Sequence, residues 1–413
     1  MEVLLVAKSL VVKFGGSCLS NPQNISLAAK KIEAEVKNGK KIVVVVSALT
    51  GVTDSLLKTA TEASLGRISK EELDEVLSMG ERTATRLMVS ALKSLGLKTV
   101  GLDPADGKFW PIYTDSKHGN AEVNLEKTLR TVRRKVKPLL DKGWVVVVPG
   151  FVGLSPEGKV TTLGRGGSDI TAVVLGRCLE VDEVVFVKDV GGVLSADPKK
   201  VPTPSKIDVL DAEEMFSLSS AGAKVLHPRT LKYATNHLTL RVVGFDEDLT
   251  AGTIIKGELG VGLRFLLHPK PVSMLTIVGK EVSTPEALLK IFSEALPVKT
   301  KILGLTLASP SLLLYVEDSS KLIKNIHNLI KTQKVAKAIH SVEPLALIVV
   351  SGHELEKIPG IVDGITAPLA KEGINLYGLL TISNSVRVFV HWDDKDKAYS
   401  LIRESLSKPS FGG

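Results

Sequence analysis

The sequence predicts a mixed α/β protein: a first domain with a mostly parallel sheet, followed by a duplicated pair of smaller α/β units. Through about residue 240, continuous runs of β-branched apolar residues alternate with helical segments. This alternation is typical of parallel sheets whose strands are buried on both faces. Beyond about residue 260 the predicted elements become shorter, and one pattern recurs after about 73 residues, which indicates a duplicated small domain.

The first domain is expected to contain four buried strands, at Leu10–Phe14, Lys41–Ser47, Val145–Val148 and Glu183–Val187. Helices are expected from about Gln23 to Lys37, between about Asp54 and Leu95, and from Thr171 to Cys178. A short hairpin-like segment precedes Gly164. In parallel sheets, ligands bind beyond the carboxyl ends of the strands, which is where the glycine loops of this chain fall.

The second part begins near Gly252–Gly262 and contains the repeat. Two strand-like runs, Leu275–Gly279 and Leu312–Val316, recur as Leu347–Gly352 and Val386–Val390. Each copy is predicted to have the order β-α-β-β-α. A final strand for the first copy is expected from about residue 335 to 340.

Composition narrows the function classes. The net charge of +8 and the pI of about 9.2 permit an anionic partner, but lysine and glutamate alternate along the predicted helices, as on a solvated surface. Aromatic residues make up only 4% of the chain, which argues against stacking platforms for single-stranded nucleic acid. The two cysteines, Cys18 and Cys178, have no metal-ligand spacing and fit a reducing, cytoplasmic setting. No apolar stretch is long enough to span a bilayer.

The most informative stretch is Gly164-Arg-Gly-Gly-Ser-Asp-Ile-Thr-Ala172. Its glycines allow close approach of backbone amides to a ligand, and the helix start behind them favours anions. Arg165 can fork onto a carboxylate or a phosphate, and Asp169 can hold a metal ion or orient a lysine. A glycine turn that only caps a helix is the alternative.

A second glycine turn, Lys13-Phe-Gly-Gly-Ser17, ends the first predicted strand. Gly15 and Gly16 can bring amides to a phosphate, and Lys13 supplies a compact positive charge. The lysine precedes the glycines, so this is not the Gly-x4-Gly-Lys-Ser/Thr phosphate loop. A buried turn without ligand is equally compatible with so short a motif.

Four further segments carry polar groups. Ser47 to Thr53 is predicted as a hydroxyl-bearing loop. Gly80-Glu81 is expected to precede a helix, where Glu81 either stabilises the helix N-terminus or accepts an ammonium group. Asp189 and the Asp197-Pro-Lys199 turn follow the strand at 183–187, and Gly222–Pro228 contains Lys224 and His227. The His-Pro pair there is more often structural than catalytic.

In combination these motifs resemble the aspartokinases of the amino-acid kinase family. The four segments 13–17, 47–53, 164–172 and 222–228 come in the family's order and rough spacing, and the duplicated units are similar to ACT domains. The resemblance implies a three-layer αβα sandwich with a mostly parallel sheet, followed by two βαββαβ ferredoxin-like ACT domains.

The resemblance also implies domain boundaries. Residues 1–258 would form the catalytic domain, with an aspartate-binding N-lobe and a nucleotide-binding C-lobe. Residues 259–413 would form the ACT pair. The first copy would span about 271–341 and the second about 342–413, with the strand near 262–268 as a candidate addition to the second.

By the same resemblance, the reaction is transfer of the ATP γ-phosphoryl group to the β-carboxylate of L-aspartate. The product, 4-phospho-L-aspartate, begins the pathway to lysine, threonine and methionine. The acceptor carboxylate is already ionised at neutral pH, so no general base is needed. Catalysis then reduces to aligning two anions and neutralising charge with lysines, amides and Mg²⁺.

Residue roles follow from the resemblance position by position. Lys13 would stabilise the transferring phosphoryl group and Asp169 would orient Lys13. The residues expected to hold aspartate are Ser47, Thr53, Glu81, Phe151, Arg165 and Ser168, with Glu81 on the ammonium and Arg165 on a carboxylate. The residues expected along the nucleotide and its phosphates are Gly15, Gly16, Ser17, Lys188, Asp189, Leu194, Lys199 and Lys224. No metal ligand is assigned.

The chain departs from the family pattern at three of these positions. Lys188 stands where the family usually has threonine, Leu194 replaces an aromatic that would lie against adenine, and Lys199 replaces a common arginine. In the ACT pair, the loop Gly279–Pro285 lacks a second glycine, and Lys301 occupies a position that tends to be aspartate. A lysine or threonine effector and a role in homodimerisation alone are therefore both open for the ACT pair.

Three other functions are compatible with parts of the sequence. Another amino-acid kinase would act on glutamate or N-acetylglutamate, although Glu81 favours a free ammonium group. A catalytically silent amino-acid sensor is favoured by Leu194 and Lys188, and opposed by Lys13, Asp169 and Lys224. Nucleic-acid binding rests on the pI alone and predicts salt-sensitive binding.

Overall fold

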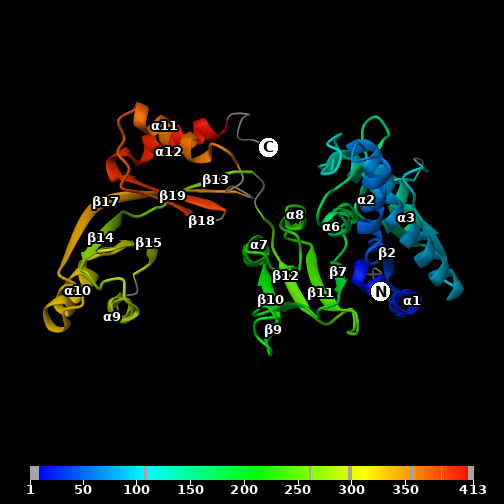
Figure 1. The fold of residues 1–413 in the computed structure, drawn as a ribbon, viewed down its shortest axis with the longest axis horizontal. Helices are drawn as coiled ribbons and strands as arrows, with labels where there is room; N and C mark the ends of the chain where they lie inside the picture. Colours follow the sequence, from blue (N-terminus) through cyan, green and yellow to red (C-terminus); the bar gives the residue numbers. More distant parts are fainter. Residues whose placement is uncertain are drawn as a thin grey trace, which may run out of the picture. The chain divides into compact units, whose positions relative to one another are not determined.

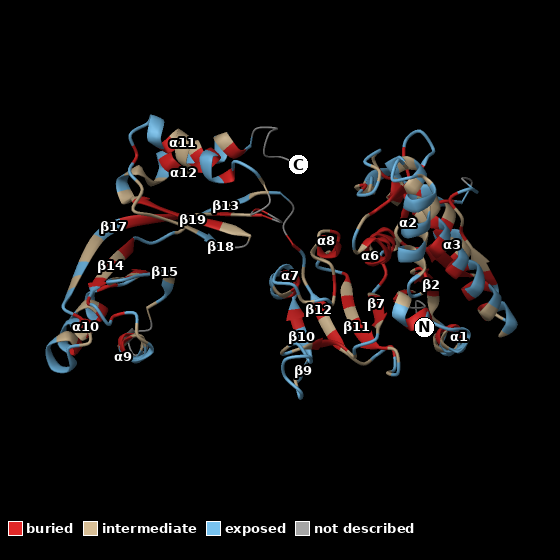
Figure 2. Cartoon of the chain, in the orientation of Figure 1, coloured by how far each residue is buried: buried red, intermediate tan, exposed pale blue. Residues whose placement is uncertain are grey.

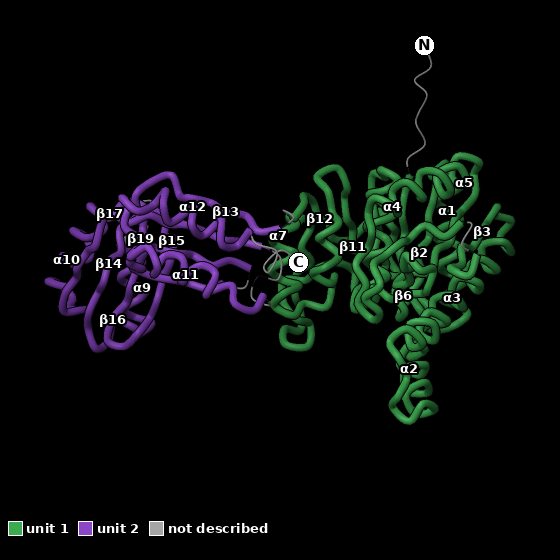
Figure 3. Tube along the Cα trace, turned by 90° about the horizontal axis from the view of Figure 1, so that it is seen from above, with its two compact units in different colours: residues 1–259 green, residues 260–413 purple. Residues whose placement is uncertain are grey.

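The structure is a computed structural model that describes residues 9–106, 109–259, 262–295, 300–352, 355, 358–382 and 384–407. The chain divides into two compact units, Met1–Leu259 and Gly260–Gly413 (Figure 3). The last residues of the second predicted ACT copy, 408–413, lie outside the described part. Among the described residues, no helix combines the length and the apolar character needed to cross a membrane.

The first unit is built on an eight-stranded sheet with the order β10-β12-β11-β7-β1-β2-β4-β3. Figure 1 shows β10, β12, β11 and β7 of this sheet side by side. Its strands are β1 Ser9–Phe14, β2 Lys41–Val46, β3 Thr99–Gly101, β4 Val145–Pro149, β7 Glu183–Lys188, β10 Val209–Asp211, β11 Thr239–Gly244 and β12 Thr253–Lys256. Only the β11–β12 pair in this sheet is antiparallel. The predicted, mostly parallel sheet is therefore confirmed.

Helices cover both faces of this sheet because successive residues of its strands point to opposite sides. Leu10 and Val12 pack into one core with α1 (Pro22–Lys37) and α3 (Lys70–Ser94). Val11 packs into the other core with α6 (Gly167–Leu179) and several shorter helical segments. These are α4 Leu125–Thr131, a π-helical turn Val132–Val136, α5 Lys137–Asp141, α7 Ala212–Ser220 and α8 Pro228–Leu231. The three-layer αβα architecture is confirmed, and its central strands are buried along most of their length (Figure 2).

The helix that carries Glu81 corrects one expectation. Gly80-Glu81 does not precede a helix: α3 runs without interruption from Lys70 to Ser94 and starts with a capping box of Ser69 and Glu72. Gly80 is needed for packing, since a Cβ there would lie 2.8 Å from the Cβ of Ala48. The glycine therefore brings the middle of α3 against the loop after β2. The use of Glu81 as a helix N-terminal charge is wrong.

Short elements complete the first unit. The expected hairpin is present as β5 (Val152–Leu154) and β6 (Val160–Thr162). A second small pair joins β8 (Val193–Leu194) to β9 (Lys206–Ile207). The turn after β1 contains the 3-10 helix Gly16–Leu19, and α2 spans Val52–Ala63.

The second unit contains one seven-stranded sheet with the order β15-β16-β14-β17-β19-β18, and β13 also pairs with β17. Its elements are β13 Arg264–Leu267, β14 Val272–Val278, α9 Pro285–Ala295, β15 Ile302–Ala308, β16 Ser311–Val316, α10 Ser320–Gln333, β17 Ala338–Ser351, α11 Ile361–Lys371, β18 Gly378–Ile382, β19 Ser385–His391, a 3-10 helix Trp392–Asp394 and α12 Lys395–Leu406. The repeated β-α-β-β-α order is confirmed.

The two copies share a strand, which differs from the expected separate strands. Residues 338–345 of β17 pair with β14, whereas residues 345–351 pair with β19 and 348–351 also pair with β13. Separate helix-covered cores lie under α9 with α10 and under α11 with α12. On the other face, Tyr315 and Phe389 stack with their ring centroids 3.8 Å apart. This stack joins the copies through a third small core.

Gly252 provides a test of how closely the antiparallel pair β11–β12 is packed. Gly252 has φ +80°, and a Cβ there would overlap the carbonyl oxygen of Val242; Gly39 has φ +81° with open space around it. We expect Gly39→Ala to cost about 1 to 2 kcal/mol of unfolding free energy from backbone strain. Gly252→Ala should cost about 2 to 5 kcal/mol because overpacking adds to the strain. Urea unfolding followed by circular dichroism measures both, and equal losses would contradict the packing argument.

Candidate active site

Four parallel strands of the first unit end at one edge of the sheet. Phe14 at the end of β1 pairs with Val46 of β2 and with Val187 of β7, and Val46 pairs with Pro149 of β4. The segments after these strands, together with the start of α6, hold most of the residues that the sequence singled out. The edge is the carboxyl end of the strands, where ligands of such sheets bind.

A buried carboxylate between two lysines occupies the centre of this edge. The Nζ of Lys13 lies 2.7 Å from Asp169 Oδ1, and the Nζ of Lys188 lies 3.0 Å from Asp169 Oδ2. Lys13 and Asp169 are only 6% and 5% exposed. Burial opposes ionisation of Asp169, but the two lysines outweigh it and lower its pKa to about 2. The carboxylate is therefore charged at neutral pH.

This cluster is positively charged overall when both lysines are protonated, since one carboxylate faces two ammonium groups. Burial lowers the pKa of Lys188, and the neighbouring Asp169 carboxylate opposes that effect. A buried excess of positive charge is costly. An anion placed beside Lys13 and Lys188 would offset this cost.

The glycine turn after β1 is pinned beside the cluster. The amide of Gly15 donates to the carbonyl oxygen of Val187 at 3.2 Å, and the hydroxyl of Thr50 donates to the carbonyl oxygen of Gly16 at 3.0 Å. A Cβ on Gly16 would lie 2.7 Å from the carbonyl oxygen of Ala48. Only glycine permits this approach, so the turn is fixed between β2 and β7. Ser17 is exposed on it.

Glu81 lies on the side of α3 that faces this edge. It is 4% exposed, and burial raises its pKa to about 7, against the opposing effects of the Ala48 amide and the Lys13 charge. Within the described part of the chain, Glu81 Oε2 has no hydrogen-bond partner. A buried acceptor without a partner is costly, and a cationic donor would satisfy it.

The Gly164–Ser168 segment meets the end of β4. Ser168 is 9% exposed, and a Cβ on Gly150 would lie 2.6 Å from its Cβ. The amide of Phe151 donates to the hydroxyl of Thr171 at 3.1 Å, and a Cβ on Gly167 would lie 2.7 Å from the Phe151 ring. The structure therefore brings Phe151 and Ser168 together. Arg165 is exposed at the turn.

The remaining predicted residues differ in how they are held. The amide of Ser47 donates to the carbonyl oxygen of Phe14 at 3.2 Å, and Thr53 belongs to the first turn of α2, not to a loop. Asp189, Lys199 and Lys224 are exposed and Leu194 is half-buried. Among the described residues, no hydrogen bond or ion pair joins Leu194, Lys199 or Lys224 to the Lys13–Asp169–Lys188 cluster.

Sequence reasoning missed two buried groups near the Gly164 turn. Asp74, on α3, accepts from Thr162 Oγ1 and from the amide of Gly119. Arg229, the residue after His227-Pro228, donates to several groups around Leu163. A charged residue directly after a His-Pro pair and a helical aspartate are weak signals, because both patterns are common on surfaces.

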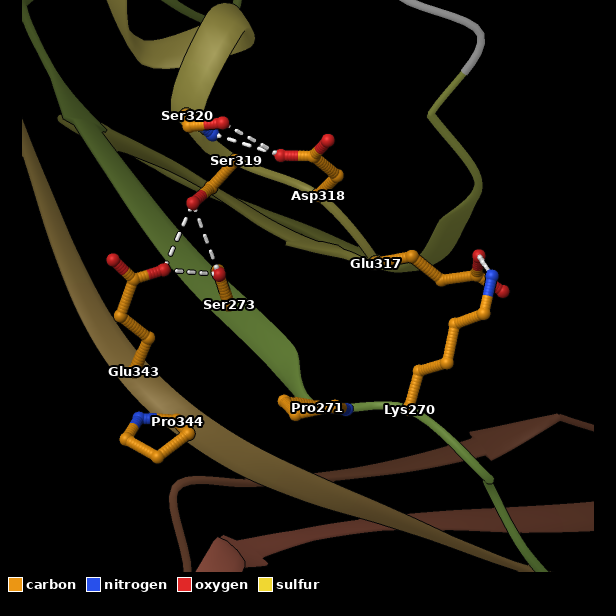
Figure 4. Close-up of a pocket in the computed structure, with 9 residues that line it drawn as sticks. All are labelled: Lys270, Pro271, Ser273, Glu317, Asp318, Ser319, Ser320, Glu343 and Pro344. Atoms are coloured by element: carbon orange, nitrogen blue, oxygen red, sulfur yellow. Dashed lines mark hydrogen bonds and ion pairs between the residues drawn. The ribbon is translucent and has the colours of Figure 1, made fainter.

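The second unit has a cavity of about 420 Å³ at the start of α10 (Figure 4). In its wall, the Glu343 carboxylate accepts hydrogen bonds from the hydroxyls of Ser273 and Ser319. Glu317 faces His268 at 3.1 Å, Lys270 at 3.6 Å and Lys301 at 3.7 Å. The Lys301 ammonium group is thus occupied by a carboxylate of its own unit. The cavity lies at the opposite end of β14 from the Gly279–Pro285 loop.

Comparison with known proteins agrees with this geometry. Residues 8–244, more than half of the chain, match the amino acid kinase family, and residues 340–404 match an ACT domain. The chain therefore belongs to the amino acid kinase family.

Within that family it belongs to the aspartokinases. It is 32% identical to the aspartokinase of Geobacillus stearothermophilus over 89% of both chains, and 30% identical to aspartokinase 2 of Bacillus subtilis over 96% of this chain and 97% of that one. The structure of aspartate kinase from Synechocystis is similar with a TM-score of 0.79 and 25% identity, covering 97% of this chain and 69% of that one. Escherichia coli aspartokinase III, solved with aspartate and ADP, shares the fold at 21% identity and a TM-score of 0.57, over 97% of this chain and 100% of that one.

Replacing Asp169 should reveal how strongly the buried cluster is coupled. Asp169→Asn leaves the buried Lys13 and the partly buried Lys188 without their carboxylate and should cost about 3 to 5 kcal/mol of unfolding free energy. Asp141→Asn removes the exposed Lys41–Asp141 ion pair of 2.7 Å and should cost under about 1 kcal/mol because solvent screens that pair. Urea unfolding at pH 7 measures both variants.

The pH dependence of that difference has a definite sign. The pKa of Asp169 in the folded protein lies near 2, below the ordinary aspartate value of 3.8, so its contribution is present above about pH 4 and is lost as the pH falls towards 2. The gap between wild type and Asp169→Asn should be constant from pH 5 to 7 and shrink below pH 4. A stability difference between wild type and Asp169→Asn that grows on acidification would contradict the lowered pKa of Asp169.

Proposed function

We propose that this aspartokinase transfers the γ-phosphoryl group of ATP to the β-carboxylate of L-aspartate, forming 4-phospho-L-aspartate. One observation carries the proposal: the amino groups of Lys13 and Lys188 meet the single carboxylate of Asp169 at the same sheet edge as Glu81, whose Oε2 has no hydrogen-bond partner among the described residues. The first suits a phosphoryl group and the second suits an α-ammonium group. The names of the relatives support the same reaction.

The amino-acid substrate is held by groups around Glu81 and the Gly164 turn. Glu81 binds the ammonium group, and the exposed guanidinium of Arg165 forks onto a carboxylate. The other residues proposed for aspartate are Ser47, Thr53, Phe151 and Ser168. N-acetylglutamate has no free ammonium group, so the buried Glu81 carboxylate would exclude it.

Phosphoryl transfer uses the lysine pair. Lys13 stabilises the transferring group, and Asp169 orients Lys13 through their 2.7 Å ion pair. Lys188 shares the same carboxylate and contributes a second positive charge, which the threonine usual at this position would not supply. Gly15, Gly16 and Ser17 lie along the phosphates; the amides of Gly16 and Ser17 face them, while the Gly15 amide is held by the carbonyl oxygen of Val187. The nucleophile is an ionised carboxylate, so alignment and charge neutralisation are sufficient.

ATP is the proposed co-substrate, with Mg²⁺ as its metal ion. Asp189, Leu194, Lys199 and Lys224 are proposed for the nucleotide. The described residues include no group of three or more His, Cys, Asp or Glu side chains placed to hold a metal ion. Mg²⁺ is usually bound through substrate phosphates and one or two carboxylates. When bound, it would neutralise charge on the phosphates; no ligand residue is assigned.

The second unit is proposed as a regulatory ACT pair through which a homodimer forms. Escherichia coli aspartokinase III has been solved with lysine and aspartate, and lysine and threonine are the effectors to test for this chain. Lys301 pairs with Glu317 and stands where an aspartate would bind the ammonium group of an effector. A chain that does not respond to lysine or threonine is therefore the alternative. We also propose a cytoplasmic location, since Cys18 and Cys178 are buried free thiols that fit a reducing compartment.

A coupled assay of ADP release with L-aspartate, L-glutamate and N-acetyl-L-glutamate tests the proposed reaction. Of the three acceptors, we expect only L-aspartate to be turned over. Adding single-stranded DNA should not change the rate, since nucleic-acid binding is the competing interpretation of the basic pI. Lys13→Ala is the control; it should lower kcat by at least about 10² to 10³-fold because one preorganised donor is lost, without unfolding the chain. Turnover with another acceptor, or near-normal turnover of Lys13→Ala, would contradict the proposal. ATP binding without ADP release would indicate a silent sensor.

Glu81 predicts a pH dependence for aspartate binding. Its pKa of about 7 in the free protein means that the carboxylate needed for an ammonium group is lost on acidification. The KM for aspartate should therefore rise below pH 7 by about tenfold per pH unit. In Glu81→Gln the KM should be high at every pH and the slope should disappear. A slope that persists in Glu81→Gln would show that another group titrates.

Glu81→Gln should weaken aspartate binding but make the folded protein more stable at alkaline pH. A raised folded pKa means that the protonated side chain is the form tolerated by burial, so stability is lost as the pH rises through 7. Glu81→Gln should therefore melt higher than wild type at pH 8.5, and the difference should shrink at pH 6. Thermal melts at both pH values measure this.

A further inference from the structure

The buried guanidinium of Arg229 has no part in the proposed function, yet it is surrounded by the segment that carries Arg165. Arg229 is 8% exposed and lies in the short helix α8. Its Nη1 donates to the carbonyl oxygen of Leu163 at 2.8 Å and to Asn120 Oδ1. Its Nη2 donates to the carbonyl oxygen of Ala121 at 3.3 Å and to Glu122 Oε1 at 2.9 Å.

Two of these contacts fix one side of the Gly164 turn. Leu163 directly precedes Gly164, and its carbonyl oxygen is held by the guanidinium. Asn120 packs on Gly164 itself, because a Cβ there would lie 2.5 Å from Asn120 Oδ1. Gly164 has φ +70°, a conformation that glycine adopts without strain. The guanidinium thus holds both the residue before the turn and the side chain that covers it.

The backbone of Arg229 reaches the other side of the same turn. Its amide donates to Nδ1 of His227 at 3.3 Å. His227 covers Gly166, since a Cβ on Gly166 would overlap the Cβ of His227. Gly166 is the N-cap of α6 with φ +75°. The neighbours of both glycines that flank Arg165 are therefore tied to Arg229.

The charge of Arg229 is balanced on the side away from the turn. Glu122 accepts from Arg229, from Lys232 Nζ at 3.2 Å and from the Tyr233 hydroxyl at 2.9 Å. Burial opposes ionisation of Glu122, but Lys232, Tyr233 and Arg229 hold its pKa below the usual range. A buried ion pair adds little net stability against apolar replacements. Its geometric specificity is the larger contribution here, because a planar guanidinium fixes four acceptors at once.

We propose that Arg229 is a positioning residue for aspartate binding: it locks Leu163–Gly166 and thereby sets the direction of Arg165. This inference rests on the proposed function, in which Arg165 binds a carboxylate of the substrate. Arg229 itself does not contact aspartate. Its loss should misplace Arg165, and a displacement of about 1 Å can cost about 100-fold in a substrate-positioning group.

Steady-state kinetics of the full chain with Arg229→Ala, Arg229→Lys and Lys232→Met test this role. Lys232→Met is the matched control, because it removes an ion pair to the same Glu122 without touching Leu163, Asn120 or His227. We expect Arg229→Ala to raise the KM for aspartate by about 10 to 100-fold, with the KM for ATP within threefold of wild type. Arg229→Lys should show an intermediate effect, and Lys232→Met almost none. Guanidinium at millimolar concentration should partly restore aspartate binding in Arg229→Ala.

Hydrogen exchange separates failure of this inference from failure of the proposed reaction. The amides of Leu163 and Gly167 donate to the carbonyl oxygens of Phe151 at 2.9 Å and Gly164 at 3.0 Å, and their exchange needs no substrate. They should exchange at least tenfold faster in Arg229→Ala and Arg229→Lys than in wild type or Lys232→Met. Unchanged exchange and unchanged KM values, or equal rises in both KM values, would overturn the positioning role. If wild type does not phosphorylate aspartate, the proposed reaction fails, and the exchange rates still decide whether Arg229 locks the turn.

Discussion

The carboxylate of Asp169 holds two lysines, from β1 and β7, at the carboxyl end of the sheet, and the rest of the site depends on that interaction. Lys13 and Lys188 come from adjacent parallel strands, and a single acceptor at the start of α6 meets both side chains. One carboxylate cannot neutralise two ammonium groups. The remaining positive charge lies beside the buried side chains of Lys13 and Asp169, where electrostatic interactions are stronger than in water. A transferring phosphoryl group is the anion that such a site would stabilise.

Close backbone packing places the substrate groups around this cluster. Gly16 and Gly80 both bring their segments against Ala48, so the phosphate turn and the helix bearing Glu81 meet at the same loop. Gly150 likewise lets the end of β4 pack closely against Ser168. Glycine at these positions is therefore explained by approach distance and not by flexibility. The consequence is that the proposed anion site at Lys13 and Lys188 and the proposed ammonium site at Glu81, with opposite electrostatic requirements, share one edge of the sheet.

The sequence was sufficient for the parts of the fold that depend on repeating patterns. The valine runs of β2 and β4 predicted strands buried on both faces, and the repeat of Leu275–Gly279 predicted the duplicated second unit. Glu81 was predicted to precede a helix, because glycine normally destabilises a helix interior. The reason for Gly80 within α3 is its packing against Ala48, which the sequence does not reveal. The shared strand β17 was divided in two because periodicity carries no information on where a strand continues into a second sheet region. Arg229 was not predicted, since its acceptors lie 66 to 109 residues away in sequence.

A crystal structure of the chain with L-aspartate and a non-hydrolysable ATP analogue tests the central claim most directly. We expect the γ-phosphate analogue to lie within hydrogen-bonding distance of the amino groups of Lys13 and Lys188, while both remain paired with Asp169. The ammonium group of aspartate should contact the Glu81 carboxylate, and Arg165 should contact a carboxylate of the same ligand. A γ-phosphate bound away from both lysines, or an aspartate whose ammonium group faces away from Glu81, would contradict the account.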